Sequence, residues 1–256
     1  MRVTAIKTDR ISAGDTDLIK FLDKNLEQLA ESSVLAITSK VVAICEGRTI
    51  PITKKVNKKD LIIRESDYYL PSYLSQYDFT FTITHRTLIP SAGIDESNGN
   101  GHYVLWPADP QKSANDIRAY LKVRFSLKDV AVIITDSTAR PLHYGTEGVT
   151  IGYSGLAALN DYVGQPDLFG RELKVSVSNV ADALASAAVV VMGEGTEQTP
   201  LAVIEAVPFV NFQANNPTAA ELHKFYISHI DDDLFAPFLK NAGWKKGGRN
   251  IELKDD

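Results

Sequence analysis

An uninterrupted apolar run at residues 130–135 constrains the fold of this chain more than any other segment. Its side chains, VAVIIT, are mostly β-branched, so the run predicts a buried strand that delivers Asp136 at its C-terminal end. A helix is predicted just before this strand, because Ser113 and Asp116 open a segment with apolar residues at helical spacing. A helix followed by a buried strand favours a mixed fold of helices and sheets.

The other elements follow from the same two periodicities. Alternating or continuous apolar segments predict strands at residues 3–7, 34–38, 41–45, 61–64, 78–84 and 201–207. Helical spacing predicts a helix at residues 17–31, and a further helix is predicted from 216 through 226. The small residues at 181–192 predict either a helix or a passage from helix to strand. Residues 91–110 and the glycine-rich residues 145–170 are expected to be irregular. No repeat or low-complexity linker divides the chain, so residues 1–256 are expected to form a single unit.

Composition excludes several classes of protein. With 256 residues, 44% of them hydrophobic, and a net charge of -5, the chain is typical of folded globular proteins. The single cysteine, Cys45, excludes a disulfide framework, a cysteine-rich zinc site and an iron–sulfur cluster. No segment has the roughly 20 apolar residues of a membrane span, and no signal peptide is present, so a cytoplasmic protein without a membrane partner is expected. The absence of a long basic run argues against a nucleic-acid partner.

The motifs of several large enzyme classes are missing. The sequence has no G-x-x-x-x-G-K-[ST] loop, no G-x-G-x-x-G, no H-E-x-x-H and no G-x-S-x-G. The histidines lack the spacing of metal ligands, and a structural role is the better interpretation for each of them: His85, His102, His143, His223 and His229. Catalysis by a nucleophilic serine or by a histidine-ligated metal is therefore not indicated.

What remains is a set of acidic residues in glycine-rich surroundings: Asp95, Asp136, Glu194 and Glu197. Carboxylate oxygens are the ligands that magnesium and manganese prefer, and such ions bridge proteins to nucleotide phosphates. Alternatively, the aspartates cap turns and the glutamates face water. The residues alone leave both interpretations open.

Four further residues are candidate contacts for anions. Lys40 follows a predicted strand and could hold a phosphate, and Gly14 with Asp15 precedes a predicted helix whose backbone N–H groups could face a nucleotide. Arg140 follows Asp136 closely and could contact an anionic substrate. A surface lysine, a helix cap and an exposed ion-paired arginine are the alternatives.

Several motifs, taken in order, resemble the coenzyme F-420 gamma-glutamyl ligase family. They are TSKVV at 38–42, EGR at 46–48, AGIDESN at 92–98, ITDS at 134–137 with RP at 140–141, the glycines between 145 and 155, the segment from Asp161 to Leu173, ADALASAA at 181–188, and VMGE at 191–194 before Pro200. The resemblance covers residues 11–207. Residues 208–256 carry no landmark and are expected to form a helical extension of unknown role.

The resemblance implies an α+β fold of mixed sheets and helices, with two intimately packed subdomains, that assembles as an intertwined homodimer. It also implies a ligase that uses GTP and two divalent cations, Mg²⁺ or Mn²⁺, to join L-glutamate to a carboxylate of a deazaflavin coenzyme through an acyl phosphate. K⁺ is a further candidate cation, and ATP remains open as the nucleotide.

The roles that the resemblance assigns can be given residue by residue. The expected metal ligands are Asp95, Asp136, Ser137 (where the family has threonine) and Glu194, and the expected catalytic residues are Asp95, Asp136 and Arg140. The expected nucleotide contacts are Gly14, Asp15, Ser39, Lys40, Asn98, Met192, Gly193 and Glu197. The choice between Glu194 and Glu197 as metal ligand favours Glu194, because it adjoins Met192 and Gly193.

The sequence departs from the family at positions expected to face the substrates. Ile44 stands where the family has a lysine that contacts the nucleotide, and Leu142 with His143 represents the usual arginine after Arg140 and Pro141. Retention of the metal positions beside changed substrate-facing positions indicates retained ligase chemistry on a different acceptor. The first hypothesis is an amide ligase that adds glutamate to a small carboxylate acceptor, with the deazaflavin coenzyme as the default. A folate acceptor, or a homologue that binds ligands without turnover, are the alternatives.

Overall fold

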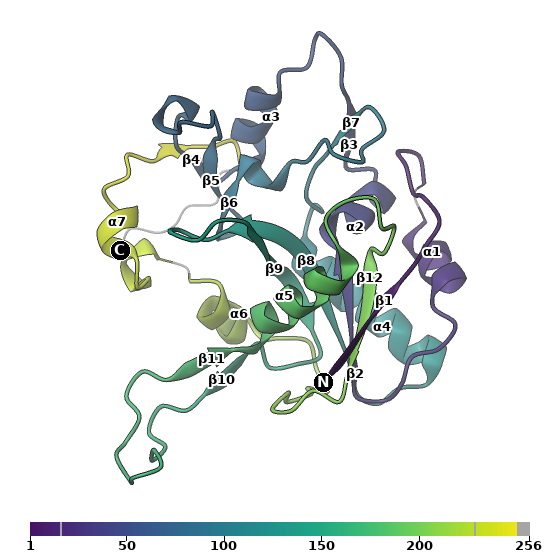
Figure 1. The fold of residues 1–256 in the computed structure, drawn as a ribbon, viewed down its shortest axis with the longest axis vertical. Coiled ribbons are helices and arrows are strands. Elements are labelled where there is room, and N and C mark those ends of the chain that lie inside the picture. Colours follow the sequence, from purple (N-terminus) through teal and green to yellow (C-terminus); the bar gives the residue numbers. More distant parts are fainter. Residues whose placement is uncertain (16, 228, 250–256) are drawn as a thin grey trace.

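The computed structural model describes residues 1–15, 17–227 and 229–249. A five-stranded sheet in the order β1–β12–β2–β8–β9 runs through its centre (Figure 1). β2 and β8 are parallel and the other neighbouring pairs are antiparallel. The strands are β1 (Arg2–Ile6), β12 (Leu201–Glu205), β2 (Ser33–Thr38), β8 (Val130–Ala139) and β9 (Thr146–Ser154).

Helices cover both faces of this sheet, because β2 and β8 are apolar on both sides. Leu35 and Ile37 pack with α1 (Leu18–Asn25) and α4 (Pro110–Phe125) in one core. Val34 and Ala36 lie in a second core with α5 (Val180–Met192), against which α6 (Ala219–Phe225) also packs. Alternate side chains of a strand point to opposite faces, so a continuous apolar strand requires two cores. The result is a three-layer arrangement of helices, sheet and helices.

A second group of elements lies above the central sheet in Figure 1. Its four-stranded sheet has the order β13–β4–β5–β6 and is joined by the separate pair β3–β7. These strands are β13 (Lys245–Lys246), β4 (Tyr68–Tyr69), β5 (Phe81–Thr84), β6 (Thr87–Pro90), β3 (Thr49–Pro51) and β7 (His102–Val104). The helices are α3 (Lys58–Glu65), η1 (Ser72–Leu74) and η2 (Ser91–Gly93). α2 (Ser39–Cys45) lies between the two groups, because its side chains pack both in the core of the central sheet and against Val104 of β7. The fold is therefore mixed α and β, as expected.

The C-terminal segment returns to this second sheet. After α6 it forms η3 (Ile230–Asp232) and α7 (Ala236–Leu239), and then β13, which pairs antiparallel with β4. The described part of the predicted helical extension therefore also contains a strand. Residues 250–256 of that prediction lie outside the described residues.

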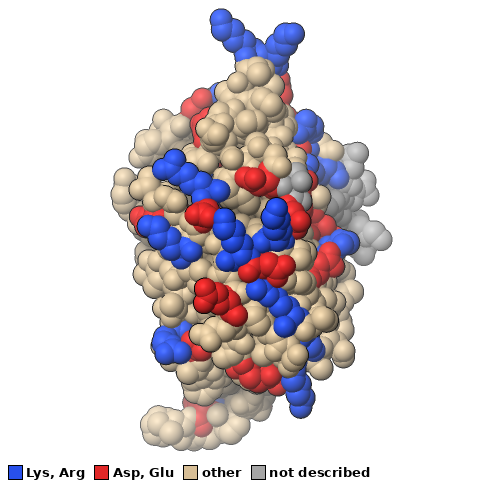
Figure 2. Space-filling view, turned by 90° about the vertical axis from the view of Figure 1, so that its right-hand side faces the viewer, with Lys and Arg blue, Asp and Glu red and all other residues tan. Residues whose placement is uncertain are grey.

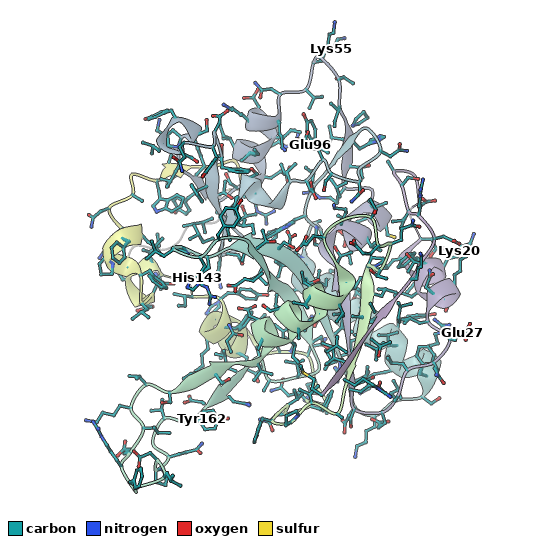
Figure 3. The ribbon with its side chains drawn as sticks, in the orientation of Figure 1. Lys20, Glu27, Lys55, Glu96, His143 and Tyr162 are labelled. Atoms are coloured by element: carbon teal, nitrogen blue, oxygen red, sulfur yellow. The ribbon has the colours of Figure 1, made fainter. Side chains whose placement is uncertain are left out.

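A two-stranded arm leaves the body of the molecule at the lower left of Figure 1. It consists of β10 (Leu159–Asp161) and β11 (Val177–Asn179), with Tyr162 beside the strands in Figure 3. Leu168 and Phe169, in the connection between the two strands, are 92% and 91% exposed. Apolar side chains of this size rarely stand so exposed on a protruding segment unless something covers them.

Two predicted strands are helices in the structure. The apolar residues at 41–45 belong to α2, which begins directly after β2 and buries all of its side chains except that of Lys40. The residues at 61–64 belong to α3, whose first turn is capped by the Asn57 side chain accepting a hydrogen bond from the backbone N–H of Lys59. A short buried run has no periodicity that separates a strand from a helix.

Several predicted boundaries were also wrong. The helix expected at 17–31 ends at Asn25, where Arg124 donates hydrogen bonds to the carbonyls of Leu22 (3.0 Å) and Leu26 (2.6 Å) and so ends the helix. The helix expected from Ser113 begins at Pro110, because the Asp109 side chain caps it. The strand expected at 78–84 begins only at Phe81, and the loop expected at 91–110 contains η2 and β7.

The glycine-rich residues 145–170 are not irregular throughout, since β9 occupies much of the segment. A Cβ on Gly148 would come within 2.5 Å of the carbonyl oxygen of Ala185, and one on Gly152 within 2.4 Å of that of Pro110. These glycines therefore allow α5 and α4 to cross the strand closely on its two faces.

The visible surface carries charges of both signs. Figure 2 shows basic and acidic side chains interspersed on the side that faces the right of Figure 1. Exposed ion pairs such as Lys112–Asp116 (2.5 Å) contribute little to the free energy of folding, so stability rests mainly on the two cores. Within the described residues, no helix combines the length and apolarity that crossing a bilayer requires.

His85 provides a pH-dependent contribution to stability. It occupies the tight turn between β5 and β6, where burial, and secondly the charge of Arg249, lower the pKa of its imidazole to about 4. Arg48 lowers this pKa further, whereas Asp109 and Glu65 raise it. Since the native imidazole stays neutral while the unfolded one takes up a proton below pH 6.5, this contribution is complete above pH 6.5 and is lost as the pH falls towards 4.

We expect the natural protein to lose roughly 2 kcal/mol more unfolding free energy between pH 7.5 and pH 5 than the variant His85→Asn. Asparagine suits the comparison because it tolerates the positive φ of 47° at this position and does not titrate. Urea unfolding of both proteins at the two pH values measures the difference. Equal losses would contradict a buried neutral imidazole.

Candidate active site

A cleft of about 1370 Å³ opens where β2 and β8 reach their shared end. Because the two strands are parallel with Thr38 opposite Thr135, the residues that follow these positions lie side by side. Ser39 and Lys40 come after β2, and Asp136 continues β8, which extends to Ala139 beyond an irregularity in its pairing with β9. Asp136 therefore lies within β8. The sequence predicts it at the end of the strand, and this boundary is wrong.

Asp95 and Lys40 form an ion pair in this cleft. The Lys40 ammonium lies 2.6 Å from Oδ2 of Asp95 and also donates to the Ser97 carbonyl at 2.9 Å. Ser97 donates its backbone N–H and its hydroxyl to the same carboxylate, both at 2.7 Å. Burial alone would raise the pKa of Asp95, but Lys40 and Ser97 hold the pKa below its ordinary value. Asp95 is therefore ionised at neutral pH.

Asp136 is the more deeply buried carboxylate of the cleft. The indole N–H of Trp106 donates to its Oδ2, and the backbone N–H of Ser137 donates to its Oδ1 at 2.8 Å. Burial raises the pKa of Asp136 to about 6, and the negative charge of Asp95 adds to this rise. A carboxylate that is costly to ionise is stabilised by any cation that enters the cleft.

The segment after α5 closes the cleft from another side. The Ser137 hydroxyl donates to Oε1 of Glu194 at 2.6 Å, and the Asn98 amide donates to the carbonyl of Gly195 at 2.9 Å. Oε2 of Glu197 accepts from the backbone N–H of Gly195 at 2.8 Å. The glutamates therefore lie with Ser137 and Asn98, which are distant in the sequence.

Most of the residues singled out in the sequence line this one cleft: Ser39, Lys40, Asp95, Asn98, Asp136, Ser137, Met192, Gly193, Glu194 and Glu197. Gly14, Asp15 and Arg140 are not among the described residues that line it. Asp15 instead accepts a hydrogen bond from the backbone N–H of Ser12 at 2.8 Å. Arg140 pairs with Glu147 at 3.4 Å across the β8–β9 hairpin.

Both departures from the family pattern face the cleft. Ile44 lines it from α2, and His143 lines it from the far end of the β8–β9 hairpin (Figure 3). Lys55, in contrast, lies at the tip of the loop before α3 in Figure 3, away from the cleft. The substitutions at 44 and 143 therefore change surfaces that a bound ligand would meet.

Sequence reasoning missed several residues of the cleft. Arg10 and Lys58 add positive charge to its wall, and Tyr77, Phe79 and Tyr144 add aromatic side chains that are more than half exposed. The alternation at residues 79–83 had indicated a half-buried strand but not what its outer face meets. An exposed aromatic next to a predicted loop is the signal that could have pointed to a ligand.

The oxygen donors of the cleft fit a hard divalent cation in kind. Asp95, Asp136, Ser137 and Glu194 all present oxygen atoms, which Mg²⁺ and Mn²⁺ prefer. Among the described residues, no group of three or more His, Cys, Asp or Glu side chains is arranged to hold a metal ion. Each of these residues instead has a partner within the protein: Asp95 pairs with Lys40, Ser137 with Glu194, and Asp136 accepts from Trp106.

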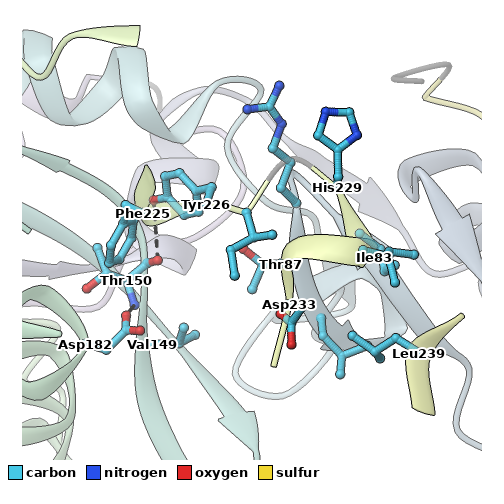
Figure 4. Close-up of a pocket in the computed structure, with 14 residues that line it drawn as sticks. Ile83, Thr87, Val149, Thr150, Asp182, Phe225, Tyr226, His229, Asp233 and Leu239 are labelled. Atoms are coloured by element: carbon cyan, nitrogen blue, oxygen red, sulfur yellow. Dashed lines mark hydrogen bonds between the residues drawn. The ribbon is translucent and has the colours of Figure 1, made fainter. Parts of the chain in front are cut away.

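A smaller cavity of about 220 Å³ lies between the C-terminal segment and β9 (Figure 4). Figure 4 shows Asp182, Thr150 and Tyr226 on one of its sides and His229 on the other. Asp182 accepts a hydrogen bond from the backbone N–H of Thr150 at 2.8 Å, which ties α5 to β9. None of the expected metal ligands, catalytic residues or nucleotide contacts is among the described residues that line this cavity, so the larger cleft is the candidate active site.

Known proteins match this chain over most of its length. The model of the family described as F420-0:Gamma-glutamyl ligase matches residues 5–206. A Coenzyme F420:L-glutamate ligase of Methanopyrus kandleri is 34% identical over 225 residues, which cover 81% of this chain and 87% of the relative. Relatives with the same name from Methanococcus maripaludis (35%, covering 86% and 85%) and Halobacterium salinarum (33%, covering 78% and 84%) are similar to it as well. This chain belongs to the F420-0:gamma-glutamyl ligase family.

Proposed function

We propose that the protein is a ligase that joins L-glutamate to a carboxylate of coenzyme F-420 with GTP as co-substrate. The observation that carries this proposal is the cleft itself, in which segments near residues 40, 95, 136 and 194 place carboxylates, a lysine and hydroxyls together. The names of the relatives support a ligase that acts on coenzyme F420 and L-glutamate.

The aromatic wall of the cleft supports a deazaflavin as the acceptor. Tyr77, Phe79 and Tyr144 are 71%, 52% and 107% exposed, although aromatic side chains gain free energy when they are covered. A flat heteroaromatic ring can stack on such side chains and leave its carboxylate tail free to reach the ammonium group of Lys40. The acceptor ring would thus be bound by apolar contact and its reactive end by charge.

The reaction needs an activated carboxylate. An acceptor carboxylate oxygen attacks the γ-phosphorus of GTP, GDP leaves, and an acyl phosphate forms. The glutamate amine then attacks the acyl carbon, phosphate leaves, and the nitrogen releases its proton as the amide forms. Lys40 can exchange its contact with Asp95 for a phosphate oxygen, and the cations Arg10 and Lys58 line the same cleft.

Divalent cations, Mg²⁺ or Mn²⁺, would neutralise phosphate charge when bound, and K⁺ is a further candidate. Asp95, Asp136, Ser137 and Glu194 are the residues that would hold the divalent cations. Asn98, Gly193 and Glu197 line the same cleft and would contact the nucleotide. Ile44 replaces a cationic contact by an apolar one, so a nucleotide would be held there by packing instead of charge.

The test is to supply the purified protein with coenzyme F-420 lacking glutamate, L-glutamate, MgCl₂ or MnCl₂, and either GTP or ATP. A gain of one glutamyl unit in the mass of the acceptor, with release of the nucleoside diphosphate, supports the proposal and identifies the nucleotide. A gain with a folate acceptor instead would reassign the substrate. Nucleotide binding without product on either acceptor would indicate a homologue without turnover.

We further propose that the protein is an intertwined homodimer of subunits built from two closely packed subdomains, with the β10–β11 arm in the dimer interface. Leu168, Phe169 and Val175 on the arm are 92%, 91% and 87% exposed in one subunit. Replacing Leu168 and Phe169 together by serine is expected to weaken dimerisation by at least about a hundredfold, since each side chain that the interface buries contributes roughly 1.5–3 kcal/mol.

Light scattering after size-exclusion chromatography, over a range of protein concentrations, measures this change. Tyr73→Ser removes a similarly exposed aromatic from η1 and serves as the control. A double variant that remains as dimeric as the control would place the dimer interface elsewhere.

A further inference from the structure

We infer that Trp106 is a positioning residue for the proposed ligase reaction, because its indole N–H fixes the orientation of the Asp136 carboxylate. Gly93, which belongs to the segment that carries Asp95, lies against the same indole. The inference rests on the proposed function, in which both aspartates act in the cleft.

The Asp136 carboxylate is held at both of its oxygens. The Trp106 indole N–H donates to Oδ2, and the backbone N–H of Ser137 donates to Oδ1 at 2.8 Å. Each oxygen therefore has its own donor, one from a side chain and one from the adjoining backbone. A carboxylate held at both oxygens cannot rotate freely, and its remaining lone pairs keep fixed directions.

Trp106 is itself rigidly placed. Its side chain is 3% exposed, and its carbonyl accepts a hydrogen bond from Nε of Arg48 at 3.0 Å. Arg48 is fixed in turn by an ion pair with Glu65 at 2.5 Å and by its carbonyl, which accepts the N–H of Leu105. The indole therefore acts as a rigid support and not as an adaptable side chain.

Gly93 packs directly against the Trp106 indole. A Cβ added at this position would lie 1.9 Å from Nε1 of Trp106, and Gly93 also has a φ of +69°. The backbone two residues before Asp95 thus lies directly against the indole nitrogen that holds Asp136. One side chain therefore fixes the relative positions of the segments that carry the two acidic residues.

A purely structural role explains this arrangement less well. A buried indole needs an acceptor, but a neutral carbonyl would satisfy it, as the Leu239 carbonyl does for Trp244, whereas a carboxylate costs folding free energy when it is buried. The Trp106 indole therefore donates to a group whose burial costs folding free energy. That cost is understandable if the carboxylate must be held in one orientation for a ligand.

The closing experiment compares Trp106→Phe with Trp244→Phe. Phenylalanine keeps an aromatic ring at each position and removes the indole N–H, which in Trp244 donates to the Leu239 carbonyl at 2.8 Å, far along the chain from the cleft. We expect Trp106→Phe to weaken binding of Mn²⁺ in the presence of GTP by 10–100-fold in calorimetry. The affinity for the acceptor alone should stay unchanged, as should all affinities of Trp244→Phe.

A second measurement uses the natural protein and does not depend on whether Trp106→Phe folds. The two tryptophans give two indole N–H signals in a ¹⁵N-labelled sample, and Trp244→Phe assigns them. Addition of Mg²⁺ with GDP is expected to shift the Trp106 signal and leave the Trp244 signal in place.

The outcomes separate this inference from the proposed function. If the natural protein forms product while Trp106→Phe binds Mn²⁺ as Trp244→Phe does, or if the Trp106 signal does not move, the positioning role is overturned and the ligase stands. If the natural protein neither binds GTP with a divalent cation nor forms product, the proposed function fails and the positioning role fails with it.

Discussion

Replacing Asp136 by asparagine is expected to reduce the rate of glutamate transfer by about a thousandfold and to abolish binding of GTP with a divalent cation. Asparagine has nearly the same shape but offers one oxygen, while the natural side chain accepts hydrogen bonds at both oxygens, from Trp106 and from Ser137. The amide NH₂ would face one of these donors. The variant therefore loses the charge and one of the two contacts that orient the group.

We expect Asp136→Asn to lose activity without a matching loss of thermal stability. Burial raises the pKa of Asp136 to about 6, so the ionised carboxylate opposes folding at neutral pH, and its removal relieves that cost. Initial rates, calorimetric titration and the thermal unfolding midpoint should therefore be measured together. Asp116→Asn, on the exposed side of α4 and paired with Lys112, is the control. Activity within tenfold of the control would exclude Asp136 from the reaction.

The sequence predicted those elements of the fold whose patterns have one interpretation. β2 and β8 are continuous apolar runs of strand length and begin within one residue of where they are expected, although β8 extends further. The small-residue segment at 181–192, which leaves open a helix or a passage from helix to strand, forms the helix α5. α2 could not be recognised, because its buried residues 41–45 present the composition of a strand. Its helical state depends on tertiary contacts that the local sequence does not encode.

The candidate site was predicted through motifs more than through physical patterns. The AGIDESN and ITDS segments brought Asp95 and Asp136 to attention, and the structure places both in one cleft. Trp106 escaped notice because a single tryptophan in a loop has no distinguishing pattern before its partner is known. The association of Gly93 with this tryptophan is likewise a property of the fold, since the glycine motif alone predicts only a turn.

Arg118 connects the part of the chain that matches the family to the C-terminal segment that lies beyond the match. It belongs to α4 and is 3% exposed. Its guanidinium donates to the carbonyls of Val130 (2.9 Å), Gln213 (2.5 Å) and Ala214 (3.1 Å). Each carbonyl is a backbone acceptor that would lose this charged donor if the side chain were replaced.

The variant Arg118→Met is therefore expected to lose roughly 3–5 kcal/mol of unfolding free energy, or about 10 °C in the thermal midpoint. Methionine fills much of the volume but donates no hydrogen bond. Lys112→Met on the same helix should change the free energy by less than about 0.5 kcal/mol, because its ion pair with Asp116 is exposed. Since Arg118 is not among the described residues that line the cleft, the rate per folded molecule should persist below the midpoint. A midpoint equal to that of Lys112→Met would show that the C-terminal segment is held by its apolar contacts alone, and a lost rate in the folded variant would show that this segment shapes the cleft.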